Sequence, residues 1–251
     1  MKKRNWFALL LVIGLTLTGC GKKENDSEII DNARKKMNAL SSYAMTMDIS
    51  MGIKSGGFEM NMPFTIAAKL DNVSKNAKMD IAIEVFGMSI ETESYVDASG
   101  EQTITYTKEV MEDAWTKSYS ENTGGLQDFA SITENSTKIE KKKSNDKTLA
   151  YYQITISKDK MQTLLNESMN AMDSTDAYVI EKDVVVDIYI DKKTNYITKM
   201  EMNLLDVMTI DDEDAELTEF KMSITFSQFD EIGTITIPAE VIENAVEEES
   251  Y

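Results

Sequence analysis

The sequence predicts a mainly β domain of the α+β class, in which a single antiparallel sheet of about ten strands is accompanied by two or three helices. Three observations support this fold class. Apolar and polar residues alternate with a period of two in many segments, spacings of three and four residues are confined to a few stretches, and neither a repeat nor a long linker divides the chain. We therefore expect one domain over residues 27–246, followed by an acidic tail at 247–251.

The first element is a helix over residues 27–40. Its apolar residues recur three and four positions apart and form one stripe along the helix, and Asp26 or Ser27 can cap its start. The period then changes to two, which predicts strands at 43–53 and 58–70.

The turn between these two strands is Ser55-Gly56-Gly57, so they form a long hairpin. Pro63 falls inside the second strand and predicts a sheet edge or a bulge there, because proline cannot donate to the strand ladder.

The rest of the chain continues in the same manner. A second helix is predicted at 158–172, residues 138–147 form a solvated strand pair with its turn, and a helix-like turn at 239–246 follows Pro238. Residues 121–137 match no pattern. Strands are predicted at 79–85, 88–96, 103–107, 115–119, 148–156, 184–190, 196–205 and 217–229.

Residues 1–19 are typical of a signal peptide. Lys2, Lys3 and Arg4 precede an apolar run from Trp6 to Leu17, which is too short to cross a hydrocarbon core about 30 Å thick. No later segment reaches the 18 or so apolar residues that a membrane span needs.

The apolar run ends in Leu17-Thr18-Gly19-Cys20, which resembles the lipobox of bacterial lipoproteins. In that family the chain is cut before the cysteine, whose thiol carries a diacylglycerol, so Cys20 would begin a lipidated tether at 20–26. Cys20 is the only cysteine of the chain and cannot form an intramolecular disulfide. The alternative is an ordinary secretory signal that ends in a cysteine by chance. We expect anchoring to the outer face of a bacterial cell membrane.

Charge and composition exclude several functions. The chain has 44 acidic and 26 basic residues and a formal charge of −18, so no nucleic-acid partner is expected. It has no histidine, which removes Ser-His and Cys-His pairs and the most frequent general base. We predict that the protein is not an enzyme and holds no cofactor.

The remaining motifs do not alter this prediction. Ser144–Lys147 and Ser157–Lys160 fit the S-x-x-K pattern of acyl enzymes, but this number of matches is expected by chance. The acidic run at 211–216 lacks the glycine of a calcium-binding EF-hand loop and is interpreted as a hairpin turn. No metal site is expected.

The order of elements resembles the LolA-like lipoproteins of the LppX and LprG type. Residues 189–200 are similar to their strand-turn-strand, and residues 226–238 are similar to their closing segment, an aromatic strand followed by a turn and Ile-Thr-Ile-Pro. The resemblance implies a strongly curved half-barrel with helices packed on its concave face. It also implies a hydrophobic cavity, which in characterised relatives accepts acyl chains, and it carries over no catalytic residue.

The 17 methionines suit such a cavity, because an unbranched thioether adapts to ligands of varied shape. The alternative is that they fill an ordinary core. The candidate cavity residues lie on the apolar phase of the predicted strands and are Met45, Met47, Met51, Met60, Met62, Met79, Ile81, Met200, Met202, Phe220 and Met222.

Two functions remain open. One is a membrane-anchored carrier or sensor of a hydrophobic, lipid-like ligand. The other is a non-enzymatic module with a closed core, whose acidic surface binds a protein partner of the cell envelope. A transporter's solute-binding protein is not favoured, since those alternate strands with helices.

The lipobox yields a direct prediction. A Cys20→Ser chain should lose incorporation of labelled fatty acid and leave the membrane fraction, because it lacks the thiol that would carry the lipid. Labelling that continues unchanged in this variant would contradict lipidation at Cys20.

Overall fold

The structure is a computed structural model that describes residues 25–85, 87–109, 114–121, 132–134, 136–170, 178–210 and 215–247. The signal peptide, Cys20 and most of the tether lie outside these residues, as do 211–214 of the acidic run and all but the first residue of the acidic tail. Most of the stretch at 121–137 that matches no pattern also lies outside.

The described residues form three helices and fourteen strands. The helices are α1 (Asp26–Asn38), α2 (Lys158–Asn170) and α3 (Ala239–Asn244). The strands are β1 (Ser42–Ser55), β2 (Phe58–Asp71), β3 (Asn76–Val85), β4 (Met88–Asp97), β5 (Gln102–Glu109), β6 (Thr116–Glu121), β7 (Ser136–Lys142), β8 (Leu149–Ile156), β9 (Tyr178–Ile180), β10 (Val184–Asp191), β11 (Ile197–Asn203), β12 (Met208–Ile210), β13 (Ala215–Ser227) and β14 (Val246–Glu247).

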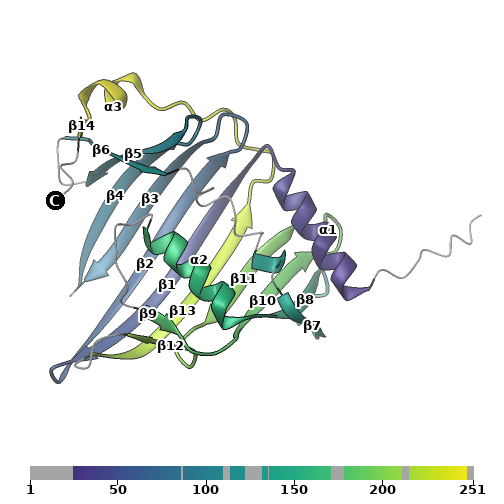
Figure 1. The fold of residues 1–251 in the computed structure, drawn as a ribbon. Coiled ribbons are helices and arrows are strands. Elements are labelled where there is room, and N and C mark those ends of the chain that lie inside the picture. The colour runs from purple at the N-terminus through teal and green to yellow at the C-terminus, as the bar shows by residue number, and fades with distance from the viewer. Residues whose placement is uncertain are drawn as a thin grey trace, which may run out of the picture.

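Twelve of the strands form one sheet in the order β14-β6-β5-β4-β3-β2-β1-β13-β11-β10-β8-β7, and β9 pairs with β12 in a second, small sheet. All pairings are antiparallel except that of β14 with β6. Figure 1 shows the large sheet as a curved, open layer with α1 and α2 on one side. The predicted mainly β class and the half-barrel with helices are confirmed.

Alternation along the strands separates two faces of the large sheet. Residues that pair directly across an antiparallel ladder lie on the same face, so the register extends one face from strand to strand. Met47 pairs with Ile66 of β2 and Ile224 of β13, and this face also packs against α1 and α2 in one core. We call it the inner face and its opposite the outer face.

The start of α1 differs slightly from the prediction. Asn25 is the N-cap, one residue before the predicted Asp26 or Ser27. Its side chain accepts from the N–H of Glu28 at 2.8 Å, and its own N–H donates to the Glu28 carboxylate at 2.9 Å. This reciprocal capping box satisfies two helix donors at once, which explains why Asn25 begins the helix.

Pro63 occupies a position where a proline is tolerated. It pairs with Ser50 of β1 without a register shift, so no bulge forms there. It lies one residue beyond Phe64–Ile83, the last pair that joins β2 to β3. At Pro63 only β1 flanks β2, so the sheet has a local edge there, as predicted.

The third helix packs on the outer face. Val241 of α3 and Ile237 form a second apolar cluster with Tyr106 of β5, and Tyr95 and Trp115 pack against it. By register, Tyr95 and Tyr106 are a direct pair on the outer face. Of the three described helices, α1 and α2 pack on the inner face and α3 on the outer face.

The segment after β13 reaches α3 along one rim of the sheet, seen in yellow in Figure 1. Asp71, which is 4% exposed, holds this segment. Its carboxylate accepts from the N–H groups of Ile235 at 3.2 Å and Val73 at 3.0 Å, and from the Ser74 hydroxyl at 2.7 Å. Burial raises the pKa of Asp71, but these hydrogen bonds and one from the Ser74 N–H outweigh it, so the pKa is lowered.

We expect Asp71→Asn to lower the free energy of unfolding by about 1–3 kcal/mol at pH 7, because buried donors lose a charged acceptor. A lowered folded-state pKa stabilises the fold above the unfolded value of about 3.9, and this stabilisation disappears as pH falls through the folded value. The difference between the two proteins should therefore shrink below about pH 4. Urea denaturation at pH 7 and pH 3 measures it.

Asp97→Asn is the matched control, since Asp97 accepts from the N–H and hydroxyl of Ser99 in an exposed turn. It should lose less stability than Asp71→Asn. An equal loss of unfolding free energy in the two variants would show that the hydrogen bonds of Asp71 to the segment after β13 add no particular stability.

Candidate functional site

All eleven predicted cavity residues lie on the inner face. In β1, Met51 pairs with Met62 of β2 and with Phe220 of β13, and Met202 of β11 pairs with Met222. The other six follow by the same register and are Met45, Met47, Met60, Met79, Ile81 and Met200. The alternation in the sequence was therefore enough to predict that these side chains share one face.

The eleven side chains lie at two depths. The buried group belongs to the core and comprises Met45, Met47, Met200, Met202 and Phe220. The half-buried group comprises Met51, Met60, Met62, Met79, Ile81 and Met222. Core filling describes the first group, whereas the second group can meet a ligand. That either group binds a ligand stays a prediction.

Most of the half-buried group gathers on β1, β2 and β3. Two further side chains, Phe64 and Ile83, join it as a direct cross-strand pair, although the predicted set omits them. Both follow the same alternation as the predicted residues, so this signal could have found them. We call this surface the open zone, and it consists of Met51, Met60, Met62, Phe64, Met79, Ile81 and Ile83.

One border of the open zone is formed by β9 and α2. The Tyr178 hydroxyl of β9 donates to the sulfur of Met51 at 3.7 Å. Gln162 of α2 fixes β9, since its side chain accepts from the N–H of Ile180 at 2.7 Å and donates to the carbonyl of Tyr178 at 3.2 Å. The open zone therefore has a defined wall on this side.

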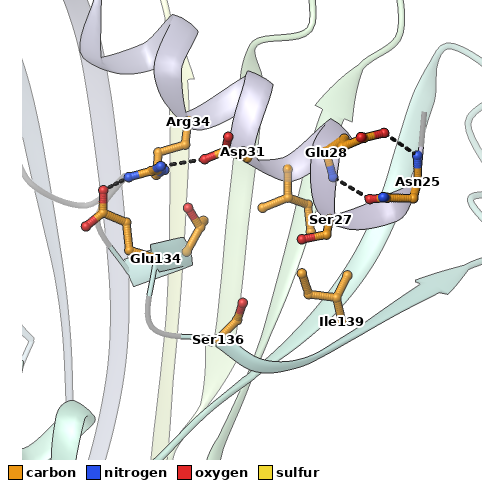
Figure 2. Close-up of a pocket in the computed structure, with 10 residues that line it drawn as sticks. Asn25, Ser27, Glu28, Asp31, Arg34, Glu134, Ser136 and Ile139 are labelled. Carbon is orange, nitrogen blue, oxygen red and sulfur yellow. Dashed lines mark hydrogen bonds and ion pairs between the residues drawn. The ribbon is translucent and has the colours of Figure 1, made fainter. Parts of the chain in front are cut away.

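A separate pocket of about 500 Å³ lies between the start of α1 and β7. Figure 2 shows Arg34 pointing toward Asp31 on its own helix and toward Glu134 across the pocket. Ile30 and Ile139 contribute apolar surface, but most of the lining is polar.

Arg34 forms ion pairs with Asp31 and Glu134 in this pocket, and Lys35 forms a further one with Asp31. Hydrogen bonds from Lys35 and Arg34 lower the pKa of Asp31, so its carboxylate stays ionised beside them. None of the eleven predicted residues lines this pocket. A pocket with ionised side chains suits an acyl chain poorly, because their desolvation would not be compensated. The open zone is therefore the better candidate for a hydrophobic ligand.

Metal chemistry finds no support in the described residues, where no three His, Cys, Asp or Glu side chains come together as ligands. The expectations of no cofactor and no catalysis stay predictions.

The sequence matches the Family of unknown function (DUF6612) over residues 25–246. The chain belongs to this family. No curated protein matches it. The DUF6612 match therefore spans the whole of the described domain and assigns it no activity.

This DUF6612 chain is similar to several solved structures. LprF from Mycobacterium bovis has 12% identity and a TM-score of 0.48, with 85% of this chain and 96% of that chain covered. A putative outer membrane lipoprotein-sorting protein domain from Vibrio parahaemolyticus has 12% identity and a TM-score of 0.28, with 87% and 96% covered.

A DUF1849 protein from Brucella abortus is also similar, at 10% identity and a TM-score of 0.29, with 75% of this chain and 98% of that chain covered. At such identities a likeness concerns the fold alone. The predicted resemblance to LolA-like lipoproteins is confirmed at this level, that of the fold. No helix in the described parts of the chain is long and apolar enough to cross a bilayer.

The two depths on the inner face predict different costs of truncation. Met45 is 1% exposed, so Met45→Ala should lower the free energy of unfolding by about 2–5 kcal/mol. Met62→Ala, in the half-buried open zone, should cost about 1 kcal/mol or less, since that side chain has already kept part of its contact with water. Urea denaturation curves of the two variants test this difference. Equal losses would mean that the open zone is packed as tightly as the core.

Proposed function

We propose that this protein binds a hydrophobic, lipid-like ligand on the open zone, as a carrier or a sensor. The observation that supports the proposal is a continuous apolar surface on the inner side of a curved sheet whose side chains are only half-buried. A folded domain rarely leaves such a surface unused, because exposed apolar patches cost free energy and promote association.

The residue types of the open zone fit such a ligand. Four of its seven members are methionines, whose flexible side chains adapt to chains of different length and branching. Each methylene taken out of water contributes about 0.8 kcal/mol, so ten of them contribute about 8 kcal/mol before the costs of association. A single acyl chain would then bind with a dissociation constant of about 1 µM or weaker. Reversible binding of this strength suits transfer or sensing.

The proposed location follows from the N-terminus. If Cys20 carries the lipid, residues 21–26 can reach at most about 20 Å, and α1 begins at Asp26. The domain would stay close to the outer face of the membrane. Its acidic charge is repelled by anionic headgroups over about 8 Å, so the domain would not lie flat on the bilayer.

We expect a blocked open zone to lose ligand binding. Met62→Trp combined with Met79→Trp fills the zone with two bulky rings, and the fluorescence of an added fatty-acid probe should then no longer report binding. Circular dichroism should still report the β-sheet, because both positions are half-buried. Met45 and Met47 are unsuitable for this experiment, since tryptophan would overpack the core there.

The matched control is Ala67→Trp combined with Ala82→Trp. These residues lie in the same two strands, β2 and β3, but on the outer face, and they leave the charge unchanged. This variant should bind the probe like the unmodified protein. Probe binding by the folded Met62/Met79 variant would contradict the proposal. If the unmodified protein, freed of lipid, binds no probe, the alternative is favoured, namely an envelope module that binds a protein partner.

A further inference from the structure

The inner face changes its chemistry between β3 and β4. Across this boundary Met79 pairs with Ser94, and Ile81 pairs with Thr92. The next ladders continue with hydroxyl groups, since Ser94 pairs with Thr107 of β5. We call the hydroxyl patch the six residues Thr92, Ser94, Thr105, Thr107, Thr116 and Ser118. The open zone and the hydroxyl patch are therefore neighbours on one continuous face.

Part of the apolar surface of β4 and β5 lies on the outer face, while Met88, Ile90 and Val96 are apolar residues on the inner face beside the patch. The outer face of β4 and β5 carries Tyr95, Ile104 and Tyr106, which the C-terminal segment and α3 cover with Ile237 and Val241. Next to these outer-face residues, alternation leaves hydroxyl residues of the patch on the inner face.

A face that is simply solvated would carry many charges in so acidic a chain, and this one carries few. Among the described side chains of β1 to β6, Glu109 is the single charged residue on the inner face. The charged residues of β4 all lie on the outer face, although apolar side chains are also packed there. The hydroxyl patch is thus polar and nearly neutral.

Most of the hydroxyl groups of the patch are only partly open to solvent. Ser94 is 2% exposed, and its hydroxyl donates to the Thr107 hydroxyl at 3.4 Å. The Thr116 hydroxyl donates to the Thr107 carbonyl at 3.3 Å. Thr92, Thr105 and Thr107 are half-buried. Such groups can exchange hydrogen bonds with ester, hydroxyl or amide groups of a ligand, but they cannot neutralise a phosphate as Lys or Arg would.

We propose that the ligand is an amphiphile with an uncharged headgroup, whose chain lies on the open zone and whose headgroup lies on the hydroxyl patch. This inference rests on the proposed function and adds selectivity to it. The described residues of β4 to β6 put no basic side chain on the inner face, so an anionic headgroup there would lose its hydration without gaining a counter-charge, and Glu109 would repel it.

The test compares two fluorescent lipids that share their acyl chains, diacylglycerol and phosphatidylglycerol. The unmodified protein should bind diacylglycerol at least about tenfold more tightly. Thr105→Lys places a positive charge in the patch and should reduce or reverse this preference. Thr225→Lys adds the same charge on the outer face, where Thr225 pairs with Thr46, and should leave the preference unchanged.

The outcomes separate this inference from the proposed function. If neither lipid binds, the proposed function itself fails. If both lipids bind equally well to the unmodified protein, the ligand site stands and the headgroup selectivity is wrong. If Thr105→Lys and Thr225→Lys shift the preference by the same amount, the headgroup does not lie on the hydroxyl patch. Circular dichroism and urea curves of both variants verify that each is folded.

Discussion

The reach of one connection constrains the shape of the whole sheet. β6 and β7 are consecutive in the chain but stand ten strand spacings apart, which is about 48 Å along the sheet. Residues 122–135 join them and can span at most about 50 Å even when fully extended. A flat sheet would leave almost no slack. Curvature shortens the direct path between the two strands, so a curved sheet gives the connection slack that a flat sheet would not.

The described end of this connection lies on the inner side. Ile132 is buried in the main core, Thr133 is buried beside it, and Glu134 is bound by Arg34 of α1. The described end of the connection is therefore held against α1, the helix that packs on the core there. A curved sheet turns the apolar side chains of distant strands toward one another. The curvature therefore accounts both for the single large core and for the open zone at its border.

Alternation predicted strands and faces well but could not predict depth. Met45 and Met60 have the same phase, yet one is in the core and the other is half-buried, because depth depends on which helices and strands happen to cover each row. Alternation also cannot tell which face of a strand is covered. For this reason the outer-face cluster around Tyr106 was not predicted, nor was the hydroxyl-rich inner face of β4 to β6. Both depend on where the C-terminal segment packs.

The two edges of the large sheet are protected in different ways. An uncovered edge strand offers free N–H and C=O groups to a second chain and so invites edge-to-edge association. At one end β7 is rich in lysine, a residue that discourages such pairing. At the other end the protein's own tail pairs with β6, as Val246 beside Thr116 and Glu247 beside Lys117. Residues 246–247 thus cover the first part of the β6 edge, and a chain shortened before Val246 would leave the backbone groups of Thr116 and Lys117 open to another strand.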